Sequence, residues 1–385
     1  MKSVFVIDPG MMEAGGHHAA LLETLIETRK NEIKLSVFAH KELDNDLYAK
    51  ALGSRISVNR HFTTNFYQHY ENSSDLKISG IQPYIRLLAW EYSQALSDVC
   101  KQNETNDQIV CFYPCMNWEH ASALSLALAS MSKGQILHHK VCCMFQPLKS
   151  SIDMDLYYKI TFRQLRKNST VKLYASDWET KNYYNSLSLH IDDFHPCYLL
   201  PWHMLDTSKS QTAGIPHVLA YFGDAKINKG FCKLPGLVKR LLLAYERNIR
   251  ITVQFTLAWE NPDLATSLSE LRSLANEYKE VTLENKFWSA SELVQKLNNV
   301  TYIICTYEVD DYQNKSSGLA WLASFFSIPV VIEGECWLTR EFDRIGVQYS
   351  VSSELSERTP SFIKKETEVG YKGALFDNIN NWLEL

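Results

Sequence analysis

The hydrophobic positions of the chain form short apolar runs that are separated by longer stretches with helical spacing. Residues 4–7 are a continuous, mainly β-branched apolar run, which is typical of a strand buried on both faces of a parallel sheet. A glycine-rich loop follows, and apolar residues then recur at the three- and four-residue spacing of a helix. Because this order of strand, loop and helix repeats along the chain, the pattern predicts an α/β protein whose mostly parallel sheet is covered on both faces.

The repeat occurs in two series, one on each side of residue 201. For the first series the pattern predicts strands at 4–7, 33–38, 109–113, 141–145 and 171–175, and helices at 121–129, 156–165 and 177–184. For the second series it predicts strands at 217–222, 251–257, 300–305 and 329–332, and helices at 234–245, 264–278 and 319–326. Ser176 or Asp177 is the expected N-cap of the helix at 177–184, since both side chains accept hydrogen bonds from the first backbone N–H groups of a helix.

The stretch between the two series has a different composition. Residues 206–214 are small and polar and end in a glycine, which is typical of a linker. The length of 385 residues also exceeds the roughly 250–300 residues that one hydrophobic core usually fills. We therefore predict an N-terminal domain over 1–203 and a C-terminal domain over 204–370.

Charge and cysteine content exclude several classes of function. The 39 Lys and Arg residues against 44 Asp and Glu residues give a net charge of −5, which provides no general attraction to nucleic acid. The 9 Cys residues are scattered without a C-x-x-C pair, so we expect buried thiols in a reducing compartment. No set of His, Cys and Asp has metal-ligand spacing, and we expect no metal. The absence of a long apolar run and of a signal sequence favours a cytoplasmic location.

Two loops of the first series carry candidate chemistry. Gly15 and Gly16 precede a helix, where glycines let the backbone approach an anion, and His17 and His18 follow them. These two histidines either touch a substrate or cap the helix. The second loop, 118–120, holds Trp118, Glu119 and His120 after a predicted strand. Glu119 or His120 is placed to orient a hydroxyl group of a ligand. Alternatively, these residues have no role in binding and only begin a surface helix.

The second series has two further loops of interest. In the first of them Gly223 follows the strand, and Lys229 and Gly230 come six residues later, before an apolar helix. In the second, Tyr307 and Glu308 follow a strand, and Ser316, Ser317 and Gly318 precede a helix, whose N–H groups attract anions. The strand at 329–332 then leads into Glu333, Gly334 and Glu335.

In this order, from Gly15 to about Gly346, these features resemble the large retaining family of nucleotide-sugar-dependent glycosyltransferases with the GT-B fold, glycosyltransferase family 4. The resemblance implies two Rossmann-like parallel-sheet domains that face each other across a cleft, and a tail helix over 371–385 that packs back on the N-terminal domain. The chain departs from the family at two places. Asp224 stands where the family has an Arg, and the Glu-x7-Glu pair falls on Asn314 and Leu322.

The resemblance also implies roles for the candidate residues. Donor binding falls on Gly15, Gly16, His17, Gly223, Lys226, Lys229, Tyr307, Ser316, Ser317 and Gly318. Catalysis falls on Lys229, Glu308 and His120, with Lys226 in place of the missing Arg and Glu308, Asp310 or Asp311 in place of the first Glu. Acceptor binding falls on His18, Trp118, Glu119 and Glu335.

The implied reaction moves a sugar from a nucleotide-sugar donor to a hydroxyl of a saccharide or lipid-linked acceptor, with retention and without a cofactor or metal. Bacterial surface polysaccharide or glycoconjugate synthesis is the expected process. The two departures keep open a catalytically inactive GT-B homologue that acts as a subunit or scaffold, and an α/β sugar-binding protein is a third hypothesis. The bases and aromatics at 157–167 fit either a half-buried helix, which we favour, or peripheral contact with a membrane.

Overall fold

The computed structural model describes residues 2–28, 32–68, 78–102, 108–131, 137–144, 146–147, 152–205, 214–257 and 261–384. The chain divides into two compact units. Unit 1 contains Met1–Met204 together with Gly373–Leu385, and unit 2 contains Leu205–Lys372. Residues 206–213 of the predicted linker, and Phe145 at the end of a predicted strand, lie outside the described residues.

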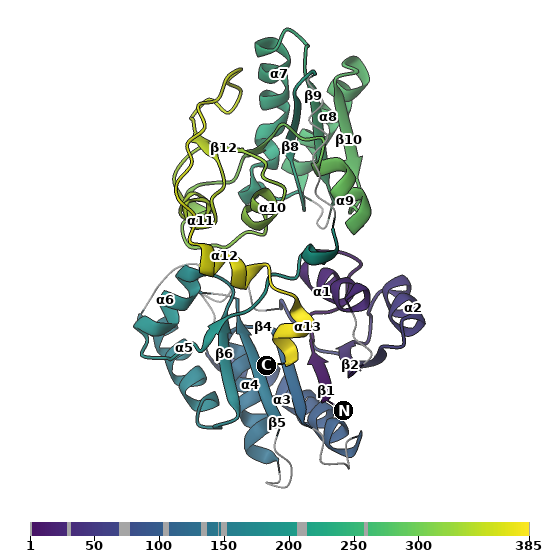
Figure 1. Cartoon of the computed structure of the whole chain (residues 1–385), viewed down its shortest axis with the longest axis vertical. Helices are drawn as coiled ribbons and strands as arrows, with labels where there is room; N and C mark the ends of the chain where they lie inside the picture. Colours follow the sequence, from purple (N-terminus) through teal and green to yellow (C-terminus); the bar gives the residue numbers. More distant parts are fainter. Residues whose placement is uncertain are drawn as a thin grey trace. The chain divides into compact units, whose positions relative to one another are not determined.

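Unit 1 is built on a sheet of seven parallel strands in the order β3-β2-β1-β4-β5-β6-β7 (Figure 1). The strands are β1 Lys2–Ile7, β2 Ile33–His40, β3 Ser57–Phe62, β4 Ile109–Met116, β5 Leu137–Cys143, β6 Val171–Ala175 and β7 Asp193–Phe194. The helices are α1 Gly16–Glu27, α2 Asn45–Gly53, α3 Ile78–Gln102, α4 Trp118–Ser130, α5 Ile152–Leu165, α6 Trp178–Ser186 and α13 Ile379–Glu384. The strand order reverses between β1 and β4, which makes the carboxyl ends of these two strands the topological switch point.

Unit 2 repeats this plan with six parallel strands in the order β10-β9-β8-β11-β12-β13 (Figure 1). The strands are β8 His217–Tyr221, β9 Arg250–Phe255, β10 Val281–Asn285, β11 Tyr302–Cys305, β12 Val330–Ile332 and β13 Tyr349–Val351. The helices are α7 Leu234–Ala244, α8 Pro262–Glu277, α9 Ala290–Leu297, α10 Leu319–Phe325, α11 Trp337–Ile345 and α12 Val369–Leu375, the last of which runs into unit 1. The switch point of this sheet lies between β8 and β11.

The strands and helices predicted from the apolar pattern are present, and most of their ends shift by a few residues. The N-cap prediction is confirmed for Asp177, whose Oδ1 accepts hydrogen bonds of 3.0 Å from the N–H groups of both Glu179 and Thr180. The pattern did not predict the outer strands β3, β7, β10 and β13. These strands expose part of their residues, so they lack the continuous apolar run that marks a central strand.

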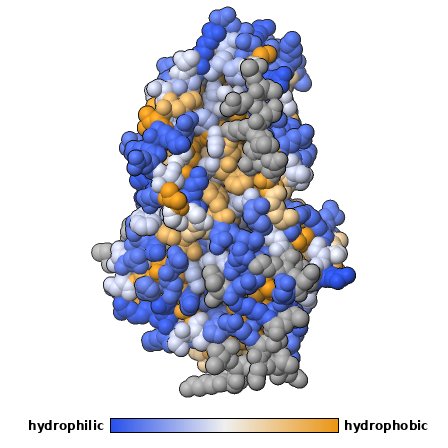
Figure 2. Space-filling view, in the orientation of Figure 1, coloured by the Kyte–Doolittle hydropathy of each residue, from blue (hydrophilic) through white to orange (hydrophobic). Residues whose placement is uncertain are grey.

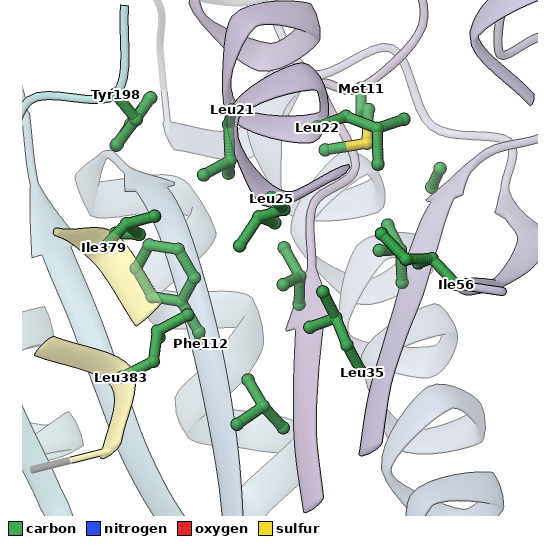
Figure 3. Close-up of a cluster of buried hydrophobic side chains, with 14 of the residues drawn as sticks. Met11, Leu21, Leu22, Leu25, Leu35, Ile56, Phe112, Tyr198, Ile379 and Leu383 are labelled. Carbon is green, nitrogen blue, oxygen red and sulfur yellow. The ribbon is translucent and has the colours of Figure 1, made fainter. Parts of the chain in front are cut away.

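The core of unit 1 joins the first helix to the C-terminal segment (Figure 3). Leu21, Leu22 and Leu25 of α1 are buried with Ile379 and Leu383 of α13 in one apolar cluster. Polar contacts fix α13 as well, because Asn380 Nδ2 donates a hydrogen bond of 2.8 Å to the carbonyl oxygen of Thr28. The segment that follows unit 2 in sequence is therefore part of the unit 1 core.

One face of the described surface is mostly polar (Figure 2), and the thiols are mostly buried. On the face shown in Figure 2, hydrophilic residues cover most of the described surface and hydrophobic residues form smaller groups. Of the 9 cysteines, all free, Cys100 and Cys232 are half-buried and the others are buried, which agrees with the expected apolar packing of thiols. Among the described helices, none is both long enough and apolar enough to cross a membrane.

Candidate functional site

The loops after β8 and β11 meet at the switch point of unit 2 and are tied together. Thr306 Oγ1 donates a hydrogen bond of 2.8 Å to the carbonyl oxygen of Lys229, and the N–H of Glu308 donates one of 2.9 Å to that of Asn228. Gly230 makes this approach possible. Its φ is +73°, and a Cβ there would lie 1.9 Å from the carbonyl oxygen of Thr306. The Lys-Gly pair read from the sequence is therefore a backbone crossing between the two loops.

Lys229 and Gly223, both predicted donor-binding residues, are brought together. Gly223 has a φ of +111°, and a Cβ on it would lie 3.1 Å from Lys229 Nζ. The N–H of Gly223 donates a 2.9 Å hydrogen bond to the Oε1 of buried Gln254, which fixes the turn. Burial lowers the pKa of Lys229 to about 8, with Asp224 opposing the shift. The ammonium thus sits in a poorly solvated place, where its charge acts strongly on a bound anion.

Asp224, the residue at the family's Arg position, has partners of its own. Its Oδ1 accepts a 3.0 Å hydrogen bond from Thr256 Oγ1, and its Oδ2 lies 3.7 Å from Lys226 Nζ. Lys226 therefore offsets the negative charge of Asp224. This pairing reduces the positive charge that Lys226 can offer to an anion.

Glu308 lies in an ion-pair cluster that sequence reasoning missed. Lys233 Nζ is 3.0 Å from Glu308 Oε1 and 2.6 Å from Glu333 Oε2. Burial acts to lower the pKa of Lys233, but the hydrogen bonds that its ammonium donates to Glu333 and Glu308 outweigh burial, and the pKa is raised. The loops after β11 and β12 are thus joined through one lysine, which lies four residues beyond Lys229.

The other predicted residues of unit 2 occupy the loop between β11 and α10. Tyr307 is buried, its hydroxyl lies 3.2 Å from Ser317 Oγ, and its ring packs on Tyr312 with centroids 4.2 Å apart. Ser317 Oγ also accepts from the N–H of Leu319, and Ser316 and Gly318 flank it at the start of α10. Glu335 is exposed after β12.

At the switch point of unit 1, four side chains form a connected set of hydrogen bonds. His18 Nδ1 lies 2.7 Å from Asp8 Oδ2, and His18 Nε2 lies 2.8 Å from the hydroxyl of Tyr67. The same hydroxyl lies 3.2 Å from His17 Nε2. Asp8 and His18 are buried, whereas Tyr67 is 39% exposed. The structure joins the predicted His17 and His18 to two residues, Asp8 and Tyr67, that the sequence did not single out.

His120 helps to hold the loop that carries Tyr67. Its Nδ1 accepts a 3.2 Å hydrogen bond from the N–H of Asn117, so Nε2 carries the proton and donates to the carbonyl oxygen of Phe66 at 3.1 Å. The rings of His120 and Phe66 also stack at 3.9 Å. Both nitrogens of this buried histidine are engaged within unit 1, and its bond to Phe66 helps to hold the backbone next to Tyr67.

Trp118 and Glu119, predicted to bind an acceptor, are also buried at the start of α4. Trp118 stacks on Tyr157 with ring centroids 5.1 Å apart. Glu119 Oε1 accepts a 3.0 Å hydrogen bond from Asn117 Nδ2, and burial raises the pKa of Glu119 to about 7. Gly15 caps α1 and Gly16 begins it with a φ of +80°, and no atom lies within 4 Å of the place of a Cβ on Gly16.

Within the described residues, one group of side chains has the composition of a metal site. Candidate ligand atoms of His17, His18 and Cys115 lie within 4.8 Å of one another. Burial raises the pKa of the Cys115 thiol well above its ordinary value, so the thiol keeps its proton. Both nitrogens of His18 already have partners in Asp8 and Tyr67. The arrangement fits a hydrogen-bond relay better than a metal centre.

Comparisons with known proteins agree with this architecture. No protein-family model and no curated protein sequence matches the chain. A UDP-forming α,α-trehalose-phosphate synthase from Burkholderia xenovorans, in complex with glucose-6-phosphate, is similar with a TM-score of 0.59 at 10% identity, over 100% of this chain and 98% of that one. A glycosyltransferase from Rickettsia africae gives 0.58 at 10% identity, over 92% and 85% of the two chains.

An enzyme of another reaction shares the same architecture. UDP-GlcNAc 2-epimerase from Methanocaldococcus jannaschii is similar with a TM-score of 0.54 at 9% identity, over 99% of this chain and 98% of that one. Identities this low show the fold alone. The predicted fold is confirmed: the chain consists of two Rossmann-like α/β domains of the GT-B fold.

Proposed function

We propose that this protein is a glycosyltransferase that moves a sugar from a nucleoside-diphosphate sugar to a hydroxyl group. The observation that carries the proposal is the ammonium of Lys229 beside Gly223, at the carboxyl end of β8. Ligands of open α/β sheets bind at this edge, at the switch point. Two of the similar structures carry UDP in their names, which supports a nucleoside diphosphate as the ligand.

The chemistry requires stabilisation of the leaving group. When the anomeric C–O bond breaks, its electron pair goes to the diphosphate, and a fixed cation next to that charge lowers the barrier. Lys229 supplies this cation, and because its pKa is about 8 the side chain is mostly protonated at neutral pH. Lys226 adds a weaker contribution because it shares its charge with Asp224. Lysine side chains thus stabilise the leaving group, which is a task that a metal ion performs in other enzymes. We therefore propose a metal-independent reaction.

Further parts of the proposal rest on the family resemblance. Glu308 stands in for the first carboxylate of the Glu-x7-Glu pair, with Oε1 held by Lys233. Gly15, Gly16 and His17 in unit 1, and Tyr307, Ser316, Ser317 and Gly318 in unit 2, contribute to the donor site. His18, Glu119, Trp118 and Glu335 belong to the acceptor side, and His120 acts there by positioning its neighbours. We propose a saccharide or lipid-linked acceptor, a role in surface polysaccharide synthesis, and a cytoplasmic or membrane-peripheral location. The family resemblance by itself implies retention of configuration.

A panel of donors tests the proposal. We expect thermal stabilisation by one nucleoside diphosphate among UDP, GDP, dTDP and ADP, and release of that nucleotide from the matching sugar donor, followed by mass spectrometry. Lys229→Ala should lose about 2–4 kcal/mol of transition-state stabilisation. Lys239→Ala is the matched control, since Lys239 is an exposed lysine on α7 whose carboxylate partner is 4.0 Å away. Wild-type turnover in the Lys229 variant would exclude the phosphate role.

A catalytically inactive homologue that serves as a subunit or scaffold is the second candidate. Two lysines near the site, Lys226 and Lys233, are already paired with carboxylates, which favours this alternative. It predicts that no nucleotide raises the melting temperature and that no sugar donor is consumed. A change of sugar configuration without release of the nucleotide would instead indicate an epimerase.

A further inference from the structure

For a neutral imidazole, the hydrogen bonds around His18 assign which atoms carry protons. Asp8 has a carboxylate, so His18 Nδ1–H donates to it over 2.7 Å and the lone pair of His18 lies on Nε2. That lone pair faces the Tyr67 hydroxyl at 2.8 Å, which therefore donates to it. The oxygen of Tyr67 accepts in turn from His17 Nε2–H at 3.2 Å. Burial lowers the pKa of His17 well below its ordinary value, in keeping with this neutral form.

The position of the His18 ring is fixed on several sides. The N–H of Gly10 donates a 3.0 Å hydrogen bond to Asp8 Oδ1, so both oxygens of this buried carboxylate are oriented. A Cβ on Gly10 would lie 2.4 Å from the His18 ring, so only glycine leaves room for it. Phe66 meets the ring edge-on, with centroids 5.5 Å apart. The imidazole is thus held in one orientation before any ligand binds.

The loop that carries Tyr67 is anchored independently. The buried carboxylate of Glu91 in α3 accepts from the N–H of Thr63 at 2.7 Å and from Thr64 Oγ1 at 2.6 Å. His120 holds the carbonyl oxygen of Phe66 in the same loop. A histidine that only stabilised the core would not need a partly exposed tyrosine at its second nitrogen. Here the bonds lead from a buried carboxylate to a partly exposed tyrosine at the carboxyl edge of the sheet.

We propose that Asp8, His18 and Tyr67 form the general base of the transfer, and we refer to them as the Asp8 relay. This inference rests on the proposed glycosyltransferase function. An acceptor hydroxyl gives its proton to the oxygen of Tyr67 while the Tyr67 proton moves to His18 Nε2. The acceptor oxygen forms the bond to the anomeric carbon, and the bond from that carbon to the diphosphate breaks with its electron pair on the phosphate. Asp8 stabilises the imidazolium until His18 releases the proton to solvent.

A protein base on the acceptor bears on stereochemistry. In a retaining transfer of the kind that the family resemblance implies, the departing phosphate itself takes the proton and no base is required. A base that activates the acceptor instead matches a single displacement, in which the acceptor enters opposite the leaving group. We therefore infer inversion at the anomeric carbon, in place of the retention that the resemblance implies.

Donor hydrolysis by water provides a test that needs no knowledge of the acceptor. With the sugar donor that the panel identifies, Asp8→Asn, His18→Ala and Tyr67→Phe are compared with His138→Ala, whose histidine is exposed on β5. We expect Asp8→Asn and His18→Ala to lower kcat about 10²–10⁴-fold, a usual contribution of a general base. Tyr67→Phe should lower it less, because a water molecule can replace the hydroxyl. Affinity for the nucleotide should stay at the wild-type value in all variants.

Azide separates a lost base from a damaged fold. The azide anion is a nucleophile that has no proton to lose, so it should restore donor consumption in His18→Ala and yield a glycosyl azide of inverted configuration. Asp8→Asn provides a second variant that preserves the volume of the site. Three results would each overturn the inference and leave the proposed function intact. They are full kcat in Asp8→Asn and Tyr67→Phe, a failure of azide to restore turnover in a folded variant, and a product that retains the anomeric configuration of the donor. A wild-type protein that consumes no donor would overturn both.

Discussion

Replacing Gly230 by alanine tests whether the crossing of the β8 and β11 loops is as tight as the structure shows. A left-handed backbone costs a residue with a Cβ about 1–2 kcal/mol. The new Cβ would also lie 1.9 Å from the carbonyl oxygen of Thr306, and relief of such overlap costs about 1–3 kcal/mol. We therefore expect Gly230→Ala to lower the free energy of unfolding by about 2–5 kcal/mol.

Urea titration followed by circular dichroism measures this change, and calorimetry with UDP measures its effect on the site. Gly370→Ala is the matched control, because Gly370 lies in helix α12 of the same unit and a Cβ there meets no atom within 4 Å. The control should be neutral or slightly stabilising, since alanine favours a helix by about 0.5–1 kcal/mol. A Gly230 variant as stable as wild type, with unchanged nucleotide affinity, would refute this view of the crossing.

The other predictions concern three titratable side chains. Affinity for UDP should decrease as pH rises through about 8, where Lys229 loses its proton, and Lys229→Met should bind weakly at every pH, as isothermal titration calorimetry can show. Burial raises the pKa of Glu119 to about 7, so the stability that this side chain contributes is present below the unfolded-state pKa and is lost as pH rises through about 7. Between about pH 5 and pH 8, the free energy of unfolding of the wild type should therefore fall by on the order of 3 kcal/mol. Glu119→Gln should abolish this fall, which urea unfolding measures. Lys233→Met leaves Glu308 and Glu333 without their shared cation, and we expect lower thermal stability that high salt partly restores, which differential scanning fluorimetry can follow.

The amino-acid sequence predicts those parts of this fold whose signal is local. The central strands β1 and β4 contain continuous apolar runs, at 4–7 and 109–113, because a strand covered on both faces needs apolar residues on both. Strand β3 mixes exposed, half-buried and buried positions and is mostly polar, so the apolar pattern predicts neither this strand nor the loop after it that carries Tyr67. The loop at Gly230 could be predicted because a Lys-Gly pair before an apolar helix is a local sequence pattern.

The polar partners of the site could not be read in this way. Lys233 bonds to Glu333 across 100 residues, and only the parallel order of β8, β11 and β12 brings the two together. Asp8 and His18 are 10 residues apart, and no periodicity marks them as a pair. The sequence predicts that His120 follows a strand, at the carboxyl edge of the sheet. The hydrogen-bond partner of its Nε2 lies in a loop more than 50 residues away in sequence, which no local pattern indicates.

The position of α13 has a consequence for the order in which the protein is made. Trp382 of this helix packs against Phe112 and Tyr174, with ring centroids 5.5 Å and 4.7 Å away, on strands that are translated long before it. All of unit 2 leaves the ribosome before residues 379–384 do. Unit 2 can therefore fold during synthesis, while the earlier-translated unit 1 keeps an uncovered apolar surface until that helix arrives. A nascent chain stalled before residue 373 should display this surface to chaperones, although it already contains every strand of both sheets.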